Sequence, residues 1–261
     1  MKRIILFRFH KNLKVCENRL NLLKRLNPNA KIFGYIEEEK RHSSLIQKLS
    51  PLFENMYFIK GKKSKWFWKN GDLALRIWYK NFGNNLNFDV LHIVEWDLLL
   101  LDSLNNIYKR IPKNGMGLSG LTLLSNVEKR WDWMIEEPSK IQWKKLLLFI
   151  KNNFNYEGKN FASLGPGTCL PKKFLEKYSN IYVPELCHDE LRLPLFGQVL
   201  GFKLYDTGFY RKWFNKKEKK FFNCIDLEIK LSIIKNELVK SSGRRVFHPF
   251  RKILDTKILD K

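Results

Sequence analysis

The feature that most constrains this sequence is the alternation of short apolar runs with segments of helical periodicity through its first half. Residues 3–9 form a run typical of a buried strand, and residues 15–26 then repeat apolar side chains at helical spacing until Asn27-Pro28-Asn29 ends the helix. Alternating strands and helices favour a mostly parallel sheet flanked by helices. We therefore expect an α/β fold of the doubly wound, Rossmann-like kind.

The same patterns predict elements along the rest of the chain. The second half is less regular, and its Gly165-Pro166-Gly167 sequence predicts a tight loop at the end of a strand. Without an internal repeat or a linker, residues 1–261 are expected to form one domain. The expected strands are 3–9, 31–36, 56–59, 90–94, 115–124, 161–168 and 202–206, and the expected helices are 15–26, 41–49, 72–82, 140–152, 171–178, 185–200 and 226–239.

Acidic residues follow two of the expected parallel strands. Glu37 closes the second strand, and Glu95-Trp96-Asp97 comes directly after the apolar run 90–94. Ligands of doubly wound sheets bind beyond the carboxyl ends of the strands, so these acids are expected at the ligand site. Two carboxylates there can hold a divalent cation that binds a diphosphate through oxygen. The alternative is a pair of exposed acids at a strand end.

The pattern of an apolar strand followed by Glu95-Trp96-Asp97 resembles the metal-binding D-x-D signature of GT-A-fold glycosyltransferases. Further along, His188-Asp189-Glu190 precedes a helix, a glycine and a last strand, which is similar to the acidic helix start of that fold. Residues 244–249, with His248 before Pro249, resemble the C-terminal segment in which some members supply a histidine to the metal. The order of these parts, over most of the chain, carries the resemblance.

The resemblance implies a metal-dependent glycosyltransferase. It would move a sugar from a nucleotide-sugar donor to a hydroxyl of a glycan or lipid-linked acceptor, with Mn²⁺ or Mg²⁺ as cofactor. Residues 1–110 would bind the nucleotide-sugar, and residues 111–261 would form the acceptor half with a basic C-terminal segment. Asp97, Glu95 and His248 would hold the metal.

The general base that the resemblance implies is Asp189 or Glu190. Adjacent helical residues lie about 100° apart, so only one of them is expected to face the substrate, and we favour Asp189. From their positions, Arg8 and Glu37 are expected to contact the nucleotide. Arg76, on the helix before the central strand, reaches either a phosphate or solvent.

The sequence departs from the family pattern in two places. Glu95 stands where the first Asp of the signature is usual, which leaves open whether it contacts metal or ribose. An Asp-x-Ser sequence after the second strand is also missing. Recognition of the base is therefore not transferred to this chain.

The charge balance suggests other partners. The chain has 49 Lys and Arg against 26 Asp and Glu, a net charge of +23, which suits a polyanionic partner or simply a lysine-rich surface. Aromatic residues lie among the cations at 60–69 and 211–222, a composition suited to an anionic membrane surface or to stacked bases. The rival hypotheses are a nucleic-acid-binding protein without catalysis, although no nucleic-acid module is recognisable, and a nucleotidyltransferase with a similar carboxylate–metal site.

No apolar stretch reaches the ~20 residues that cross a bilayer. The N-terminus regains charge at Arg8, before the core of a signal peptide could develop. We therefore expect a cytoplasmic protein, attached peripherally to the inner face of a membrane if the basic-aromatic segments bind lipid.

Overall fold

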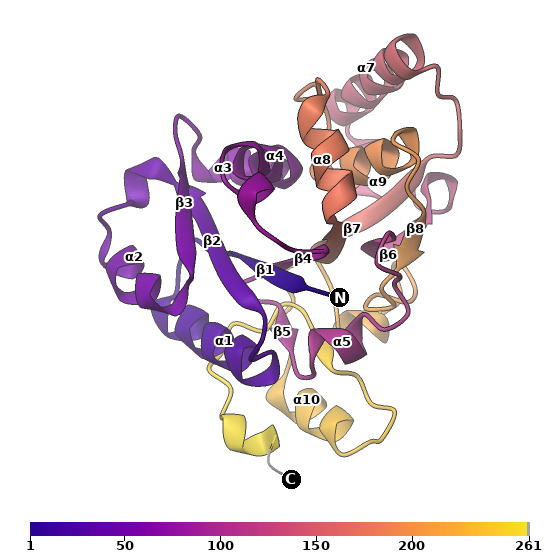
Figure 1. The fold of residues 1–261 in the computed structure, drawn as a ribbon. Coiled ribbons are helices and arrows are strands. Elements are labelled where there is room, and N and C mark those ends of the chain that lie inside the picture. The colour runs from indigo at the N-terminus through magenta and orange to yellow at the C-terminus, as the bar shows by residue number, and fades with distance from the viewer. Residues whose placement is uncertain (260–261) are drawn as a thin grey trace.

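The computed structural model describes residues 1–259 and contains a seven-stranded sheet of order β3-β2-β1-β4-β7-β6-β8 (Figure 1). A separate two-stranded sheet pairs β5 with β9. The strands are β1 Arg3–Arg8, β2 Lys31–Glu37, β3 Asn55–Ile59, β4 Val90–Glu95, β5 Leu99–Leu100, β6 Met116–Leu123, β7 Phe161–Pro171, β8 Leu204–Asp206 and β9 Val246–Phe247.

The large sheet is mostly parallel. The first four strands in the order, β3, β2, β1 and β4, pair in parallel. β7 runs antiparallel to both of its neighbours, β4 and β6, and β8 is parallel to β6, so β7 alone is reversed. The expected mixed α/β class, with a mostly parallel sheet flanked by helices, is confirmed.

Ten α-helices are found among residues 1–259, with short 3₁₀ turns between some of them. The helices are α1 Leu13–Leu26, α2 Ser44–Leu49, α3 Ser64–Lys69, α4 Gly71–Asn81, α5 Leu104–Ile107, α6 Asp132–Ile135, α7 Glu137–Phe154, α8 Lys172–Asn180, α9 Asp189–Val199 and α10 Leu231–Leu238. The 3₁₀ turns are Glu38–Lys40, Ser50–Leu52, Gly83–Asn85, Leu124–Asn126, Glu218–Lys220 and Thr256–Leu259.

Alternation along β1 builds two cores. Successive strand side chains point to opposite faces of a sheet, so Ile4 and Leu6 pack with α4, α7, α8 and α9. Ile5 and Phe7 pack instead with α1, α2 and α5. Figure 1 shows α1 and α2 on one side of the sheet and α4, α8 and α9 on the other. The two faces explain why β1 is apolar at every position between its charged ends.

The C-terminal segment returns to the first half of the chain. Phe247 and Phe250 are fully buried against Leu22 and Leu99 in a third core. Two backbone hydrogen bonds fix the path: Leu101 N–H donates to Arg245 O at 2.8 Å, and Phe250 N–H donates to Asp97 O at 2.8 Å. This packing places residue 248 beside the end of β4, about 150 residues earlier in the sequence.

Three expected elements differ from the structure. Gly165-Pro166-Gly167 was predicted as a loop, but it lies inside β7, where pairing with β6 shifts register and Gly167 takes a φ of 80°. The helix expected from residue 185 begins at Asp189, because the carbonyls of residues 186 and 187 accept from Arg192 and Cys187 has a φ of 62°.

The helix expected from residue 226 begins five residues later, at Leu231. The Asn223 side chain holds the preceding loop, since its Oδ1 accepts from the N–H groups of Ile225 and Leu227. Its Nδ2 also donates to Leu227 O at 2.8 Å. An asparagine that satisfies backbone groups in this way competes with helix formation.

Candidate functional site

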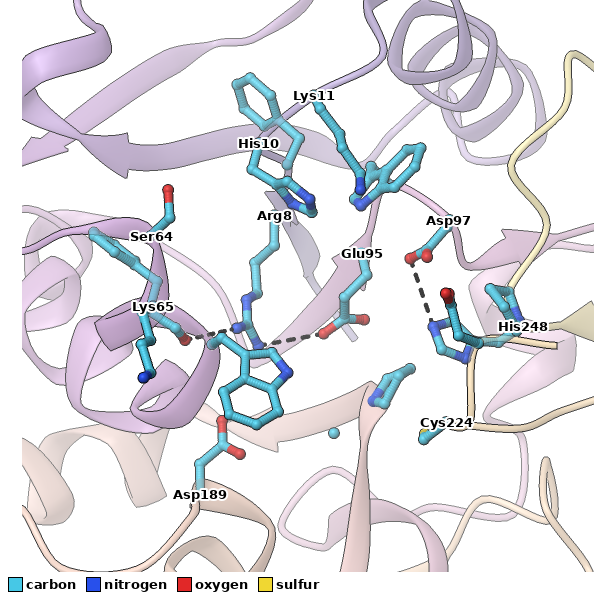
Figure 2. A pocket seen from close by; sticks show the side chains of 18 of the residues that line it. Arg8, His10, Lys11, Ser64, Lys65, Glu95, Asp97, Asp189, Cys224 and His248 are labelled. Atoms are coloured by element: carbon cyan, nitrogen blue, oxygen red, sulfur yellow. Dashed lines mark hydrogen bonds and ion pairs between the residues drawn. The ribbon is translucent and has the colours of Figure 1, made fainter. Parts of the chain in front are cut away.

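A cavity of about 630 Å³ lies beyond the carboxyl ends of β1, β2 and β4. Arg8, Glu37 and Glu95 end these three strands, and the register pairs Arg8 directly with Glu95. Figure 2 shows how side chains from the strands meet others from α9 and the C-terminal segment. Seven of the eight site residues predicted from the sequence line this cavity: Arg8, Glu37, Glu95, Asp97, Asp189, Glu190 and His248.

Arg76 is the eighth, and the structure does not bring it to the cavity. Its Nε donates to Tyr178 O at 2.8 Å, and its Nη2 donates to Ile181 O. The guanidinium therefore joins α4 to the end of α8. The sequence placed Arg76 on the correct helix but could not tell which face of that helix points to the cavity.

Arg8 and Glu95 form an ion pair at the floor of the cavity. Arg8 Nη1 lies 3.3 Å from Glu95 Oε1, and Arg8 Nη2 donates to Phe67 O at 3.1 Å. Glu95 Oε2 accepts from Gly167 N–H at 3.4 Å. Burial raises the pKa of Glu95 to about 7 against the opposing effect of Arg8. Glu95 thus already has a positively charged partner, the Arg8 guanidinium.

Asp97 lies between Arg251 and His248 of the C-terminal segment. Arg251 Nε donates to Asp97 Oδ2 at 3.1 Å, and His248 Nε2 is 3.5 Å from Asp97 Oδ1 (Figure 2). Burial works against ionisation of Asp97, but His248 and Arg251 outweigh it and lower its pKa to about 2. Asp97 is therefore a carboxylate at neutral pH.

The tautomer of His248 follows from its other ring nitrogen. Nδ1 lies 2.7 Å from Asn223 O, and a carbonyl oxygen can only accept, so Nδ1 carries a proton. In the neutral ring, Nε2 then presents a lone pair to the Asp97 carboxylate. A proton on Nε2 or a bound metal ion would satisfy both acceptors. Burial lowers the pKa of His248, but the carboxylates Asp97 and Glu95 raise it by more, so the net shift of the pKa is upward.

The fit to a divalent metal is partial. A ligating histidine usually donates its second N–H to a carbonyl or carboxylate, as His248 does, and one carboxylate with one imidazole suits Mn²⁺ better than a soft metal. Yet no three His, Cys, Asp or Glu side chains in residues 1–259 are arranged to hold a metal ion. Of the three expected ligands, Glu95 is paired with Arg8, whereas Asp97 and His248 face each other. Asp97 and His248 would be two protein ligands of a metal site whose other coordination positions are open.

Asp189 and Glu190 both line the cavity, contrary to the expectation that only one would face it. The cavity wraps the first turn of α9, so two positions about 100° apart both reach it. Asp189 Oδ1 lies 2.8 Å from His188 Nδ1. Glu190 Oε1 accepts from Gly165 N–H and its Oε2 from Trp133 Nε1–H, both at 2.9 Å.

The pKa values of these two acids move apart. Burial would raise the pKa of Asp189, but the charges of His188, Arg8 and Arg192 lower it. Burial raises the pKa of Glu190, and its neighbours do not reverse that shift. Adjacent acids with diverging pKa values are the arrangement that acid–base chemistry requires.

Glu37 lies at the rim of the cavity. It accepts a hydrogen bond from Ser64 Oγ at 2.6 Å and pairs with Lys40. Burial opposes its ionisation, but the bonds from Lys40 and Ser64 outweigh it and lower its pKa. The carboxylate that closes β2 is thus oriented by α3 and by the turn that follows it.

Sequence reasoning missed several residues of the cavity. Tyr35 Oη and His188 Nε2 are buried, and neither forms a hydrogen bond with a described residue. Arg251 holds Asp97, and Trp68 is exposed at the cavity. Alternation along β2 could have indicated Tyr35, since it lies two residues before Glu37 and so shares its face.

Most aromatic side chains of the two basic-aromatic segments are at least partly buried. In 211–222, Phe222 is fully buried and Trp213 is partly buried, with its Nε1 donating to Gly120 O. In 60–69, Trp66 is half-buried and donates to Glu185. Trp68 is the exception. Most of these aromatic rings pack against other residues of the protein. Within residues 1–259, no helix combines the length and the apolar character that a membrane span needs.

Comparisons with known proteins give a likeness to solved structures alone. No protein-family model and no curated protein matches the sequence. Among solved structures, the chain is similar to the galactosyltransferase LgtC, crystallised in complex with donor and acceptor sugar analogues. The two are 13% identical, the alignment covers 80% of this chain and 74% of that one, and the TM-score is 0.41. The chemistry of the cavity therefore rests on its own residues.

Proposed function

We propose that this protein is a glycosyltransferase that moves a sugar from a nucleotide-sugar donor to a hydroxyl of a glycan or lipid-linked acceptor. The observation that carries the proposal is the meeting of three groups in one cavity. These are the Glu95–Asp97 carboxylates at the end of β4, His248 from the C-terminal segment, and the buried acids Asp189 and Glu190 of α9. The order of motifs in the sequence points to the same reaction.

The donor would lie along the carboxyl ends of β1, β2 and β4, where ligands of doubly wound sheets bind. Glu37, at the end of β2, accepts hydrogen bonds and suits the ribose hydroxyls. Arg8 and Lys11 supply positive charge on the same wall of the cavity. Burial lowers the pKa of Arg8, but Tyr35, Glu95 and Asp189 raise it more, so the guanidinium keeps its charge.

Mn²⁺ or Mg²⁺ would be held by Asp97 and His248, with the remaining positions open to substrate oxygens. A bound divalent cation neutralises the charge that a leaving diphosphate develops. Arg251 keeps Asp97 ionised and oriented, and Asn223 keeps the Nε2 of His248 directed at the cavity. Glu95, paired with Arg8, is placed to accept from a donor hydroxyl.

The acceptor hydroxyl needs a base, because an alcohol is a poor nucleophile at neutral pH. Glu190 suits that role through its raised pKa, which brings a carboxylate closer to the working pH. Asp189 pairs with His188 and would orient the first turn of α9. This assignment differs from the preference for Asp189 that the sequence alone suggested.

Attachment to an anionic membrane, where lipid-linked acceptors are found, remains part of the proposal. Because most aromatic rings of the two basic segments are packed, attraction would come from lysine charge and would fall steeply with salt. Liposome flotation at two salt concentrations tests this. Binding that does not depend on anionic lipid would remove the membrane from the proposal.

The experiment that tests the function is hydrolysis and transfer with a panel of nucleotide-sugars, with and without Mn²⁺. We expect slow hydrolysis of at least one donor, stimulated by Mn²⁺ and abolished by EDTA. Release of pyrophosphate from a nucleoside triphosphate and a sugar phosphate would instead identify a nucleotidyltransferase. Inactivity with every donor, together with retained nucleic acid and a steep salt slope, would favour the nucleic-acid-binding alternative.

A further inference from the structure

Three rings from separate parts of the chain gather above α9. His188 stacks on Trp133 with ring centroids 4.3 Å apart and an interplanar angle of 15°. Trp68, on α3, meets the edge of His188 at 5.2 Å and lies 5.3 Å from Trp133. Trp133 also donates to Glu190 Oε2. The cluster therefore contacts the acidic pair of the cavity directly.

Trp68 is unusual within this cluster. Of the eight tryptophans, all of which lie in the described residues, Trp68 alone is exposed, with 57% of its surface accessible. Its ring lines the cavity. A large exposed apolar ring in a concave, polar site is a typical sign of ligand recognition, whereas a buried ring is ordinary packing.

His188 provides a second, independent observation. The residue is 6% exposed and lines the cavity, and its Nε2 bonds to no described residue. Its Nδ1 lies 2.8 Å from Asp189 Oδ1 and accepts from Glu190 N–H at 3.3 Å, so the neutral ring carries its proton on Nε2. Burial lowers the pKa of His188, but Asp189 and Glu190 raise it by more, and both the neutral and the protonated ring present an N–H at Nε2. An unpaired buried donor of this kind is satisfied by a ligand oxygen.

We propose that Trp68 and His188 form the subsite that binds the sugar ring of the acceptor. One face of a pyranose exposes C–H bonds with partial positive charge, which the negative face of an indole attracts. Trp68 would stack on that face, and His188 Nε2–H would donate to a ring hydroxyl. The proposal rests on the proposed function, because it takes the acids beside this cluster as the group that receives the acceptor proton.

The position of the cluster favours the acceptor over the donor. The base must lie within about 3 Å of the acceptor hydroxyl, and Glu190 is bonded to the same Trp133 that carries His188. The groups suited to a diphosphate, Asp97 and His248, come from the end of β4 and from the C-terminal segment instead. Trp68 is also the exposed ring of the cluster, and an acceptor that enters from solvent needs an exposed ring to stack on.

Two measurements on the full chain test the subsite. The first is ligand-observed NMR with methyl glucoside, methyl galactoside and methyl N-acetylglucosaminide, in the absence of any nucleotide. The second is the acceptor KM for the best of these glycosides in the transfer assay. The variants are Trp68→Ala, Trp68→Phe and Tyr182→Ala. Tyr182 is a matched control, since it is 72% exposed and does not line the cavity.

We expect Trp68→Ala to abolish the NMR signal and to raise the acceptor KM about tenfold, with kcat changed by less than about threefold. Trp68→Phe should keep most of the binding, because it keeps an aromatic face, and Tyr182→Ala should match the wild type. Wild-type acceptor KM in Trp68→Ala would overturn the subsite, and so would a rise confined to the donor KM. Glycoside binding that depends on Trp68 without transfer from any donor would instead overturn the proposed function and leave the subsite standing.

Discussion

Two clusters of buried charge meet α9 about one helical turn apart, at Asp189 and at Arg192, and they differ in how fully their polar atoms are bonded. Arg192, fully buried, pairs with Asp72, with Nε–Oδ2 and Nη2–Oδ1 distances of 2.9 and 2.5 Å. Asn70 Oδ1 accepts from its Nη2, and Tyr178 Oη donates to Asp72. The other acceptors of the guanidinium are the carbonyl oxygens of Lys69, Leu186 and Cys187.

The second cluster, here called the cavity cluster, includes Arg8, Tyr35, Glu95, His188 and Asp189 and is open by comparison. Arg8 has only Glu95 and Phe67 O as hydrogen-bond partners among the described residues, and Tyr35 Oη and His188 Nε2 have none. The difference separates two uses of buried charge. A saturated network fixes how α9 sits on α4 and α8, whereas an unsaturated one leaves donors and acceptors for a ligand. Substitutions should therefore separate stability from activity.

The largest expected effect is on stability, from Arg192→Met. The change leaves Asp72 buried without its partner, which typically costs about 3–5 kcal/mol. Urea denaturation at pH 7 measures the loss. The matched control is Arg8→Met, whose side chain is 21% exposed at the cavity, so that solvent can reach the freed Glu95. It should destabilise the protein less while abolishing donor hydrolysis.

Arg192→Met combined with Asp72→Asn sharpens the comparison. Removing the buried charge on both sides should recover part of the stability that the single change loses, since the cost lies in the unpaired carboxylate. Equal losses from Arg192→Met and Arg8→Met would contradict the distinction between the two clusters.

The next effect concerns metal dependence. Asp97→Asn removes the carboxylate that faces His248 Nε2 and should lower Mn²⁺-stimulated activity by about 10²-fold or more, given that even indirect partners of metal ligands contribute 10–100-fold. The melting temperature should also fall, because Asp97 is buried and loses its pairs with His248 and Arg251, so activity is compared well below the transition. Calorimetry with Mn²⁺ and a nucleoside diphosphate measures the binding. Full activity in the variant, or in excess EDTA, would exclude Asp97 as a ligand.

The two acids of α9 provide the third test. Glu190→Gln should lower turnover by about 10²-fold with donor binding retained, the scale of a lost general base. Asp189→Asn should have the smaller effect if Asp189 acts through His188. Steady-state kinetics with donor and acceptor varied separately makes the comparison. If the amide at 189 is the more damaging one, the roles are reversed, and wild-type turnover in both variants would place the base elsewhere.

Much of this arrangement could be predicted because it follows from local patterns. The apolar runs fixed β1, β2 and β4, and the carboxyl-end rule then placed Arg8, Glu37, Glu95 and Asp97 at one edge. His248 was found through its motif, although β9 brings it there by pairing with a strand about 150 residues away. Seven predicted residues meet in one cavity for these reasons.

The rest depends on contacts that local patterns do not encode. Arg192 and Asp72 are 120 residues apart in sequence, so their network could not be foreseen. The same holds for the ion pair that Glu95 forms with Arg8. Gly165-Pro166-Gly167 looks like a loop because its strand character comes from β6, which pairs beside it with shifted register.

The smallest expected effect is the pH dependence of the His188–Asp189 pair. The pKa of His188 is raised in the folded protein, so its contribution to stability is complete below the unfolded value near 6.5 and is lost as pH rises through the folded pKa. The pKa of Asp189 is lowered, so its contribution is present above the unfolded value near 3.9 and is lost as pH falls through its folded pKa. Stability from the pair is thus greatest between these limits.

His188→Gln should flatten the decline in stability on the alkaline side, where one proton changes the free energy of unfolding by at most about 1.4 kcal/mol per pH unit. Urea denaturation from pH 5 to 9 measures the curve, with the exposed His42 changed to Gln as the control that should keep the wild-type shape. An unchanged slope in His188→Gln would mean that the ring is neutral in the folded protein, and the cavity cluster would then differ from the Arg192 network by its unbonded Nε2–H group and not by an additional positive charge.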